Sequence, residues 1–302
     1  MALRTAPPRA SHPIWIEKAS VGTSITKVVT IAVIVGVMLF PFLYVLSVSL
    51  STQADLAGSS VTLIPKHPTL EAYRQILAGG VVTRALVVSV CVTVVGTVVS
   101  MVMTTTLAYG LTRTRQVPGS RLVLLMVLGT LLFSAGIIPN YLLVRYLGML
   151  NSYEALIVPG LISAFNLVVV RQFFMNIPDE LTDAARIDGA GPFQVFWHII
   201  LPLSKAVLAV VALFYGVALW SDFFNALIYL NDTTKWPIQL VLRLFVLQGQ
   251  NIAQSQQVGQ PAPPAETVQM AVVIIATAPI ILVYPFLQKY FTQGVLSGAV
   301  KG

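Results

Sequence analysis

The sequence has little charge and almost no cysteine. Charged residues make up 10% of its 302 residues, while hydrophobic residues make up 56%. This balance lies outside the range of soluble globular domains and is typical of membrane proteins. The single cysteine, Cys91, excludes an intramolecular disulfide and a thiolate metal site. The three histidines are too scattered along the chain to predict a metal site.

Motifs for nucleotide binding and catalysis are also missing. The chain has no G-x-x-x-x-G-K-[ST] loop, so it cannot bind ATP by that device. It has no G-x-S-x-G or H-E-x-x-H motif. Asp222, which lies within an apolar segment, has no second carboxylate beside it in the membrane. Both absences disfavour an intramembrane enzyme. An ion-coupled secondary transporter would need several ionisable groups within the membrane, and Asp222 is nearly alone. We expect no catalytic residue, metal or cofactor in this chain.

Six apolar segments are long enough to cross a bilayer, which needs about 20 residues of helix. They are residues 27–50, 82–110, 121–140, 153–173, 204–230 and 266–288. We therefore predict an all-α membrane protein with six transmembrane helices. Pro139 and Pro159 blur the boundaries of the third and fourth segments, although neighbouring helices satisfy backbone groups that a proline frees.

The predicted spans divide the chain into tails, loops and a core. The parts are a tail at 1–26, a first helix at 27–50, an outer segment at 51–81, a five-helix core at 82–290 and a tail at 291–302. Within the core, an inner loop covers 174–203 and an outer loop covers 231–265. With both termini inside, twelve of the 18 lysines and arginines lie on the inner side. The positive-inside rule therefore predicts cytoplasmic termini, and the net charge of +7 does not point to nucleic acid.

The inner loop contains a charged hairpin of two short helices at 178–202, reading PDELTDAARIDGAGPFQVFWHIILP. Pro178 suits the first helical position, Gly189 can end that helix, and Pro192 and Pro202 can start and end the second. The residues that share one helical face are Leu181, Ala184, Ala185 and Asp188. The two alanines make this face flat, so we predict helix-in-groove docking on another protein. The alternative is an interfacial helix, which the acidic residues disfavour because the inner leaflet is anionic.

The spacing Asp183-Ala184-Ala185, Gly189 and Ile199-x-Leu201-Pro202 resembles the signature loop of binding-protein-dependent ATP-driven importers. The likeness extends over roughly residues 60–302, in ARIDGAGPFQVFWHIILPLSKAVLA, ALWSDFFNALIYLND and KYFTQGVLSGAVKG. These stretches are similar to carbohydrate-type ABC importer permeases, in particular the oligosaccharide and polysaccharide subclass. The family usually begins the signature with glutamate, so Asp183 keeps the charge on a shorter side chain.

The resemblance implies a type I ABC importer permease fold in the bacterial cytoplasmic membrane. It also implies a non-catalytic subunit that pairs with a second homologous permease, two ATPase subunits that bind ATP and Mg, and an extracellular solute-binding protein. Residues 248–264 are either a surface for that binding protein or a simple tether. The residues expected to dock on the ATPase are Glu180, Leu181, Asp183, Ala184, Ala185, Asp188, Gly189 and Ala190.

A substrate path is predicted around Asp222 in the fifth span, where a charge costs about 2.5–3.5 kcal/mol. Its neighbours Trp220, Asn225 and Tyr229 offer aromatic faces and hydrogen bonds that suit a sugar. Asn140 and Asn166 are weaker candidates, because polar side chains in spans often hold helices together. Alternatively, Asp222 pairs with a partner helix or caps a local kink. A similar permease for a non-sugar solute also stays open.

Overall fold

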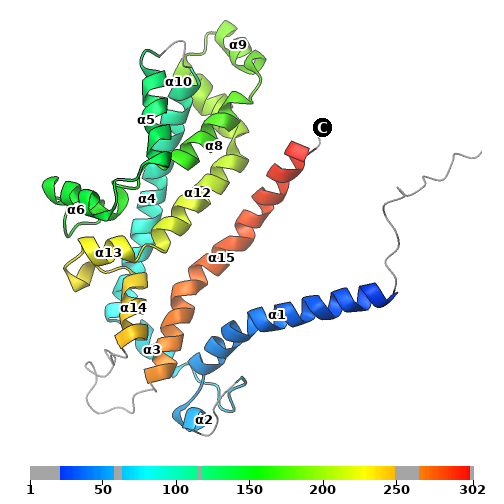
Figure 1. Ribbon diagram of the computed structural model, residues 1–302, viewed down its shortest axis with the longest axis vertical. Coiled ribbons are helices and arrows are strands. Elements are labelled where there is room, and N and C mark those ends of the chain that lie inside the picture. Colours follow the sequence, from blue (N-terminus) through cyan, green and yellow to red (C-terminus); the bar gives the residue numbers. More distant parts are fainter. Residues whose placement is uncertain (1–20, 58–62, 114–116, 249–264, 300–302) are drawn as a thin grey trace, which may run out of the picture.

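The computed structural model describes residues 21–57, 63–113, 117–248 and 265–299, and every regular element in these ranges is a helix (Figure 1). Among the described residues, three helical stretches are long and apolar enough to cross a membrane. They are α1 (Val21–Ser49), α4 (Val81–Thr112) and the part Ala265–Pro285 of α15 (Ala265–Ala299). The predicted all-α membrane architecture is confirmed, and these stretches correspond to the first, second and sixth predicted spans.

The third and fourth predicted spans are not continuous helices. Segment 121–140 divides into α5 (Ser120–Leu132) and α6 (Ile137–Tyr146), because Phe133 is extended and Gly136 has a left-handed φ of 81°. Segment 153–173 contains the short α7 (Glu154–Ile157) and only then α8 (Ala164–Met175). Both α5 and α8 are therefore shorter than a helix that crosses the bilayer upright.

The fifth predicted span, 204–230, is broken as well. It consists of α12 (Lys205–Trp220) and α13 (Phe224–Tyr229), separated by residues 221–223. The helical segment Pro192–Leu203, which precedes α12, is bent by 83° relative to it. An apolar composition alone does not reveal these breaks, because the residues on both sides are largely hydrophobic.

The remaining helices gather at the two ends of the long axis. One end carries α9 (Asp179–Ile187) and α10 (Pro192–Val195), followed by the π-helical turn η1 (Phe196–Ile200) and by α11 (Leu201–Leu203). The opposite end carries α2 (Gln53–Ala57), α3 (Glu71–Leu77), α14 (Ile238–Gln248) and the start of α15 (Figure 1). The 3-10 turn η2 (Thr233–Lys235) precedes α14. The hairpin and the predicted outer segments thus lie at opposite ends, as expected for opposite membrane faces.

Helix α4 lies at the centre of the bundle, in contact with α8 and α12, and α12 also contacts α15. Small residues on α4 allow this close approach. A Cβ atom at Gly96 would lie 2.6 Å from Leu219 Cδ1 of α12. Helix α1, in contrast, runs away from the bundle and is buried only at Ser47, Val48 and Ser49 (Figure 1).

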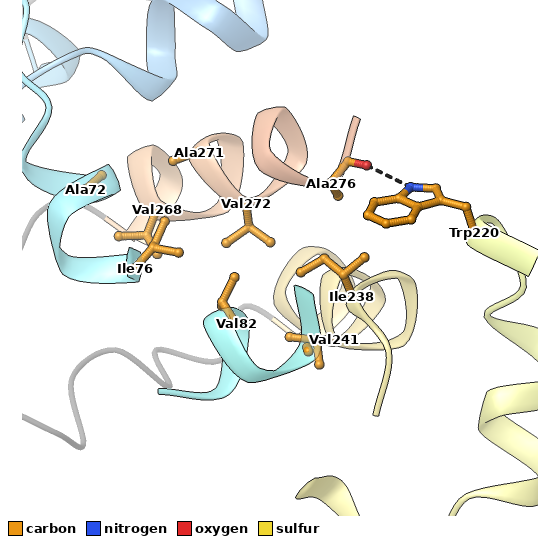
Figure 2. Close-up of a cluster of buried hydrophobic side chains, with 11 residues drawn as sticks. Ala72, Ile76, Val82, Trp220, Ile238, Val241, Val268, Ala271, Val272 and Ala276 are labelled. Atoms are coloured by element: carbon orange, nitrogen blue, oxygen red, sulfur yellow. Dashed lines mark hydrogen bonds between the residues drawn. The ribbon is translucent and has the colours of Figure 1, made fainter. Parts of the chain in front are cut away.

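A cluster of buried side chains joins α3, α4, α14 and α15 at the end opposite the hairpin (Figure 2). Trp220, at the end of α12, belongs to this cluster and is only 6% exposed. Its indole Nε1 donates a hydrogen bond of 3.0 Å to the carbonyl oxygen of Ala276 in α15. This bond satisfies the polar group that a buried tryptophan brings into an apolar core.

Candidate functional site

Helix α9 contains no buried residue. Pro178 occupies the N-cap rather than the first helical position, so that prediction was off by one residue. Asp179 and Glu180 lie in the first turn, where their charge is favourable next to the positive end of the helix dipole. Thr182 Oγ1 donates to the Asp179 carbonyl oxygen at 2.9 Å. Local hydrogen bonds and charge thus stabilise a helix that gains little from burial.

The end of α9 is fixed by a hydrogen-bonded turn. Gly189 has the predicted left-handed conformation, with φ 85°. Its N–H donates to the Arg186 carbonyl oxygen at 3.0 Å, and the Ala190 N–H donates to the Ala185 carbonyl oxygen at 2.9 Å. These two bonds form a Schellman motif, which satisfies carbonyl groups that a helix end otherwise leaves without partners.

The predicted docking face of α9 is divided between two directions. Leu181, Ala184 and Asp188 are exposed, as are Glu180 and Asp183. Ala185 and Ala190 instead are half-buried and contact the core formed by α4, α8, α10 and α12. The flat surface expected from the Ala-Ala pair is therefore only half available to a partner.

Exposed apolar residues that the sequence analysis did not select extend this surface. Ile187 is 87% exposed at the tip of the hairpin. Phe193 and Trp197 are also exposed, and their ring centroids are 6.2 Å apart in an edge-to-face arrangement. The spacing of Phe193 and Trp197 at i and i+4 was the available signal, because such residues share a helical face.

The second part of the hairpin is longer than predicted. Pro192 starts α10, as expected, and the Gly191 N–H donates to Gln194 Oε1 at 2.9 Å. Pro202 does not end the helical run, because it lies inside α11, which continues to Leu203. The direction changes at Ser204, the N-cap of α12, whose side chain makes no capping hydrogen bond.

A cleft of about 460 Å³ separates α9 from the ends of α4 and α8. Its lining is polar and carries both signs of charge, including Arg113, Arg186, Asp179 and Asp183. Within it, Arg186 Nη1 and Asp183 Oδ1 form an exposed ion pair at 3.0 Å. The hairpin thus contacts the bundle mainly through its alanines and its second helix.

The predicted substrate-path residues near the break in the fifth span have structural contacts. Trp220 is buried with its N–H satisfied, so its ring is not an open platform for a sugar. The Asp222 carboxylate accepts hydrogen bonds from the Asn225 backbone N–H at 3.1 Å and from Asn225 Nδ2 at 2.8 Å. Asp222 therefore caps the first turn of α13, which agrees with the alternative of a capped kink.

The other candidates do not converge on Asp222. Tyr229 is buried and its ring stacks on Tyr141, with centroids 6.3 Å apart. Asn140 is exposed on α6. Asn166 is buried at the start of α8 and lines a separate cleft of about 440 Å³ together with Tyr215. The predicted set is therefore spread over several helices rather than gathered in one site.

One cation near the break escaped the sequence analysis. The Arg243 guanidinium of α14 lies over the ring of Phe223, with its Cζ 5.1 Å from the ring centroid. Both side chains have exposed surface. Cation–π contact holds an arginine side chain in place without neutralising its charge. Arg243 lies in α14 and Phe223 in the break before α13, 20 positions earlier, so the local sequence offered no sign of this pairing.

Comparison with known proteins identifies the family. Residues 121–297 match the family described as the binding-protein-dependent transport system inner membrane component. The chain belongs to this family. Protein LplC of Bacillus subtilis (strain 168) is 44% identical over 292 residues, which cover 96% of this chain and 99% of that protein. The polygalacturonan/rhamnogalacturonan transport system permease protein YtcP of the same organism is 43% identical over 268 residues, covering 88% and 93% respectively.

A solved structure supports the same assignment. It is that of a bacterial ABC transporter involved in the import of the acidic polysaccharide alginate. The TM-score is 0.85 at 28% sequence identity, over 93% of this chain and 100% of that chain. The expected ABC importer permease fold is therefore confirmed. The chain is a membrane permease subunit of an importer family that works with ATPase and binding-protein partners.

Proposed function

We propose that this permease passes oligosaccharides containing acidic sugars across the cytoplasmic membrane of a bacterium. The observation that carries the proposal is similarity over nearly the whole chain to a polygalacturonan/rhamnogalacturonan permease. The alginate importer, whose polysaccharide is also acidic, supports the same substrate class. A permease for a neutral sugar is the competing possibility, since an arabinooligosaccharide permease is 29% identical.

Arg243 and the broken fifth span support an anionic substrate. Discontinuous membrane helices in transporters commonly mark places where substrates bind. Arg243 adds a fixed positive charge near the break at residues 221–223, and Phe223 adds an apolar ring face. Asp222, Asn225 and Tyr229 stay candidates for the same path, while Asn166 lines a separate cleft and Asn140 is exposed on α6.

Uptake measurements test the substrate class. Cells that carry the complete transporter should take up partial hydrolysates of polygalacturonate or alginate, and Arg243→Gln should lower this uptake about tenfold, by loss of one charged hydrogen bond. Arg243→Lys should restore part of it. Arg74→Gln, which changes an exposed arginine on α3, is the matched control. Uptake confined to neutral oligosaccharides would rule out the acidic class.

We also propose that the hairpin at 178–202 docks on an ATPase subunit that binds ATP and Mg. The exposed side chains of Leu181, Ile187 and Asp188 support this role, because an unpartnered helical face suits a partner's groove. Glu180, Asp183 and Ala184 border the same surface, while Ala185, Gly189 and Ala190 hold its shape. Docking requires the hairpin and both termini to lie on the cytoplasmic side.

Co-purification tests the docking role. In a tagged chain, Ile187→Asp should reduce the amount of ATPase subunit recovered while leaving the permease folded in the membrane. Ile64→Asp is the matched control, because Ile64 is 83% exposed at the opposite end of the molecule. Equal recovery from both variants would remove the hairpin tip from the docking surface.

The full assembly in this proposal contains a second homologous permease, two ATPase subunits and an extracellular solute-binding protein. The outer loop at 231–265 faces the binding protein in this arrangement. The sequence predicts that residues 248–264 are either a surface for the binding protein or a tether. These residues fall almost entirely outside the described residues. Native mass spectrometry of the purified complex measures this composition directly.

A further inference from the structure

The end of α4 is tied to the second helix of the hairpin by a relay of side chains. Tyr109 Oη donates a hydrogen bond of 3.0 Å to the carbonyl oxygen of Pro192, the first residue of α10. Arg113 Nη2, one turn further along α4, donates to the same hydroxyl oxygen. The hydroxyl group therefore accepts on one side and donates on the other, which fixes its orientation.

The same tyrosine ring also contacts two neighbouring side chains. Its ring centroid lies 4.9 Å from that of Phe196 in η1. The Arg113 guanidinium lies over the ring, with its Cζ 4.8 Å from the centroid. Arg113 is the C-cap of α4, where a cation is favoured by the negative end of the helix dipole. The end of α4 thus stabilises the charge of Arg113, and Arg113 in turn holds the Tyr109 side chain in place.

The segment that enters the hairpin is tied to α4 as well. Arg171 Nε of α8 donates at 3.0 Å to the carbonyl oxygen of Leu111 in α4. The helices before and after α9 are therefore both bonded to the last two turns of α4. Helix α9 itself is separated from α4 by the 460 Å³ cleft. A displacement of α9 can be transmitted to α4 through α10 and Tyr109. Alternatively, α9 can tilt into the cleft without moving α4.

We propose that Tyr109 is the positioning residue that makes the hairpin and α4 move as one body. The proposal rests on the docking role of the hairpin, because the force is taken to arrive from an ATPase subunit. With the Tyr109 hydroxyl present, displacement of α10 displaces the end of α4. Without it, α10 can separate from α4 while the ATPase subunit stays bound. Tyr109 thus acts through α4 and touches neither substrate nor nucleotide.

Distance measurements between spin labels test this directly in the purified complex. The labels are placed at His198→Cys in η1 and Val87→Cys in α4, both exposed, in a Cys91→Ser background. Val87 lies about 33 Å along the helix axis from Tyr109, which suits pulsed dipolar spectroscopy. The labelled chain that keeps Tyr109 should give one narrow distance between the two labels. This distance should not change when ATP and vanadate are added.

Tyr109→Phe keeps the ring and removes the hydroxyl relay. It should raise the population of separated conformers about tenfold, seen as a broadened or second distance. Tyr109→Ala, which also removes the ring contacts, should broaden the distance further. Tyr146→Phe, on the exposed face of α6, is the matched control and should leave the distance unchanged. With the same complex reconstituted into vesicles, Tyr109→Phe should lower the amount of substrate taken up per ATP hydrolysed. The ATPase subunit should remain bound.

Two results would overturn the proposal. One is an unchanged distance in both Tyr109 variants, with and without ATP and vanadate. The other is a distance that shifts with ATP and vanadate although the tyrosine is intact. Failure of the docking role is detected separately, by co-purification: in that case no hairpin variant changes the amount of ATPase subunit recovered. The nucleotide-free distances still decide whether Tyr109 holds α10 on α4 in that case.

Discussion

The two ends of this permease are stabilised in different ways. At one end, helix α9 buries no side chain and depends on backbone caps, such as the Schellman turn at Gly189, while α10 and η1 beside it belong to a separate core. The opposite end buries eleven side chains from α3, α4, α12, α14 and α15 in one cluster (Figure 2). If the exposed face of α9 is the docking surface proposed above, it cannot also be buried in a core of this chain. Substitutions on that face should therefore act on assembly, and substitutions in the cluster at the opposite end should act on folding.

The largest effect is expected at Trp220, in the buried end. Trp220→Ala removes a large side chain and its hydrogen bond to Ala276, which should destabilise the chain by about 3–5 kcal/mol. Trp220→Phe should lose less than Trp220→Ala, because it keeps one aromatic ring while giving up part of the buried surface and a hydrogen bond worth about 1 kcal/mol. The measurement is thermal stability of the tagged complex in mild detergent. Phe224→Ala, at a partly exposed aromatic residue nearby, is the control, and an equal loss there would contradict the burial argument.

A smaller effect is expected at Gly189, in the exposed end. Gly189→Ala places a side chain at φ 85°, a conformation that costs an L-residue about 1–2 kcal/mol. Global stability should change little, while trypsin should cleave faster after Arg186 in inside-out vesicles. Gly191→Ala is the control, because Gly191 has an ordinary φ of −72°. Equal cleavage rates in the two variants would show that the turn does not hold the end of α9.

An acid-dependent effect is expected near α2, at the buried end. Burial raises the pKa of Asp55, but hydrogen bonds from His67 and Thr52 outweigh it and hold this pKa below 3.8. A depressed pKa means that the ionised carboxylate stabilises the fold above pH 3.8 and that this contribution is lost as the pH falls through the folded pKa. Thermal stability should therefore drop more between pH 5 and about pH 3 in the wild type than in Asp55→Asn. If thermal stability fell equally with pH in the wild type and in Asp55→Asn, the stabilising role of the ionised carboxylate would be contradicted.

The smallest effect on stability is expected at Asp183. Its ion pair with Arg186 is exposed, so Asp183→Asn should change stability by no more than about 0.5 kcal/mol. The same variant should nevertheless reduce recovery of the ATPase subunit, if the carboxylate belongs to the docking surface. Gln172→Ala, at an exposed side-chain pair on α8, is the control. Unchanged recovery in Asp183→Asn would separate this carboxylate from docking.

The sequence was sufficient where structure follows from local chemistry. Gly189 and Pro192 determine where one short helix ends and the next begins, and both were predicted from residue type alone. The long apolar runs of α1, α4 and α15 were equally clear, because a helix that spans the bilayer needs about 20 apolar residues and a soluble core helix does not.

The rest depends on contacts between distant residues. Trp220 resembled a sugar platform in the sequence, but its N–H bonds to Ala276, 56 positions away. Ala185 shares a helical face with Leu181, yet it contacts the core because α9 packs beside α10. The break at residues 221–223 has no helix-breaking residue, and its cap by Asp222 is recognisable only with α13 in place.

The bend at Ser204 has a geometric consequence. Helix α12 has 16 residues and is about 24 Å long, so a rotation of about 10° about its first residue displaces its far end by about 4 Å. That far end is Trp220, whose indole is bonded to the backbone of α15 at Ala276. If the hairpin docks on an ATPase subunit as proposed, a small tilt at its end would become a shift of about 4 Å at the opposite end of α12.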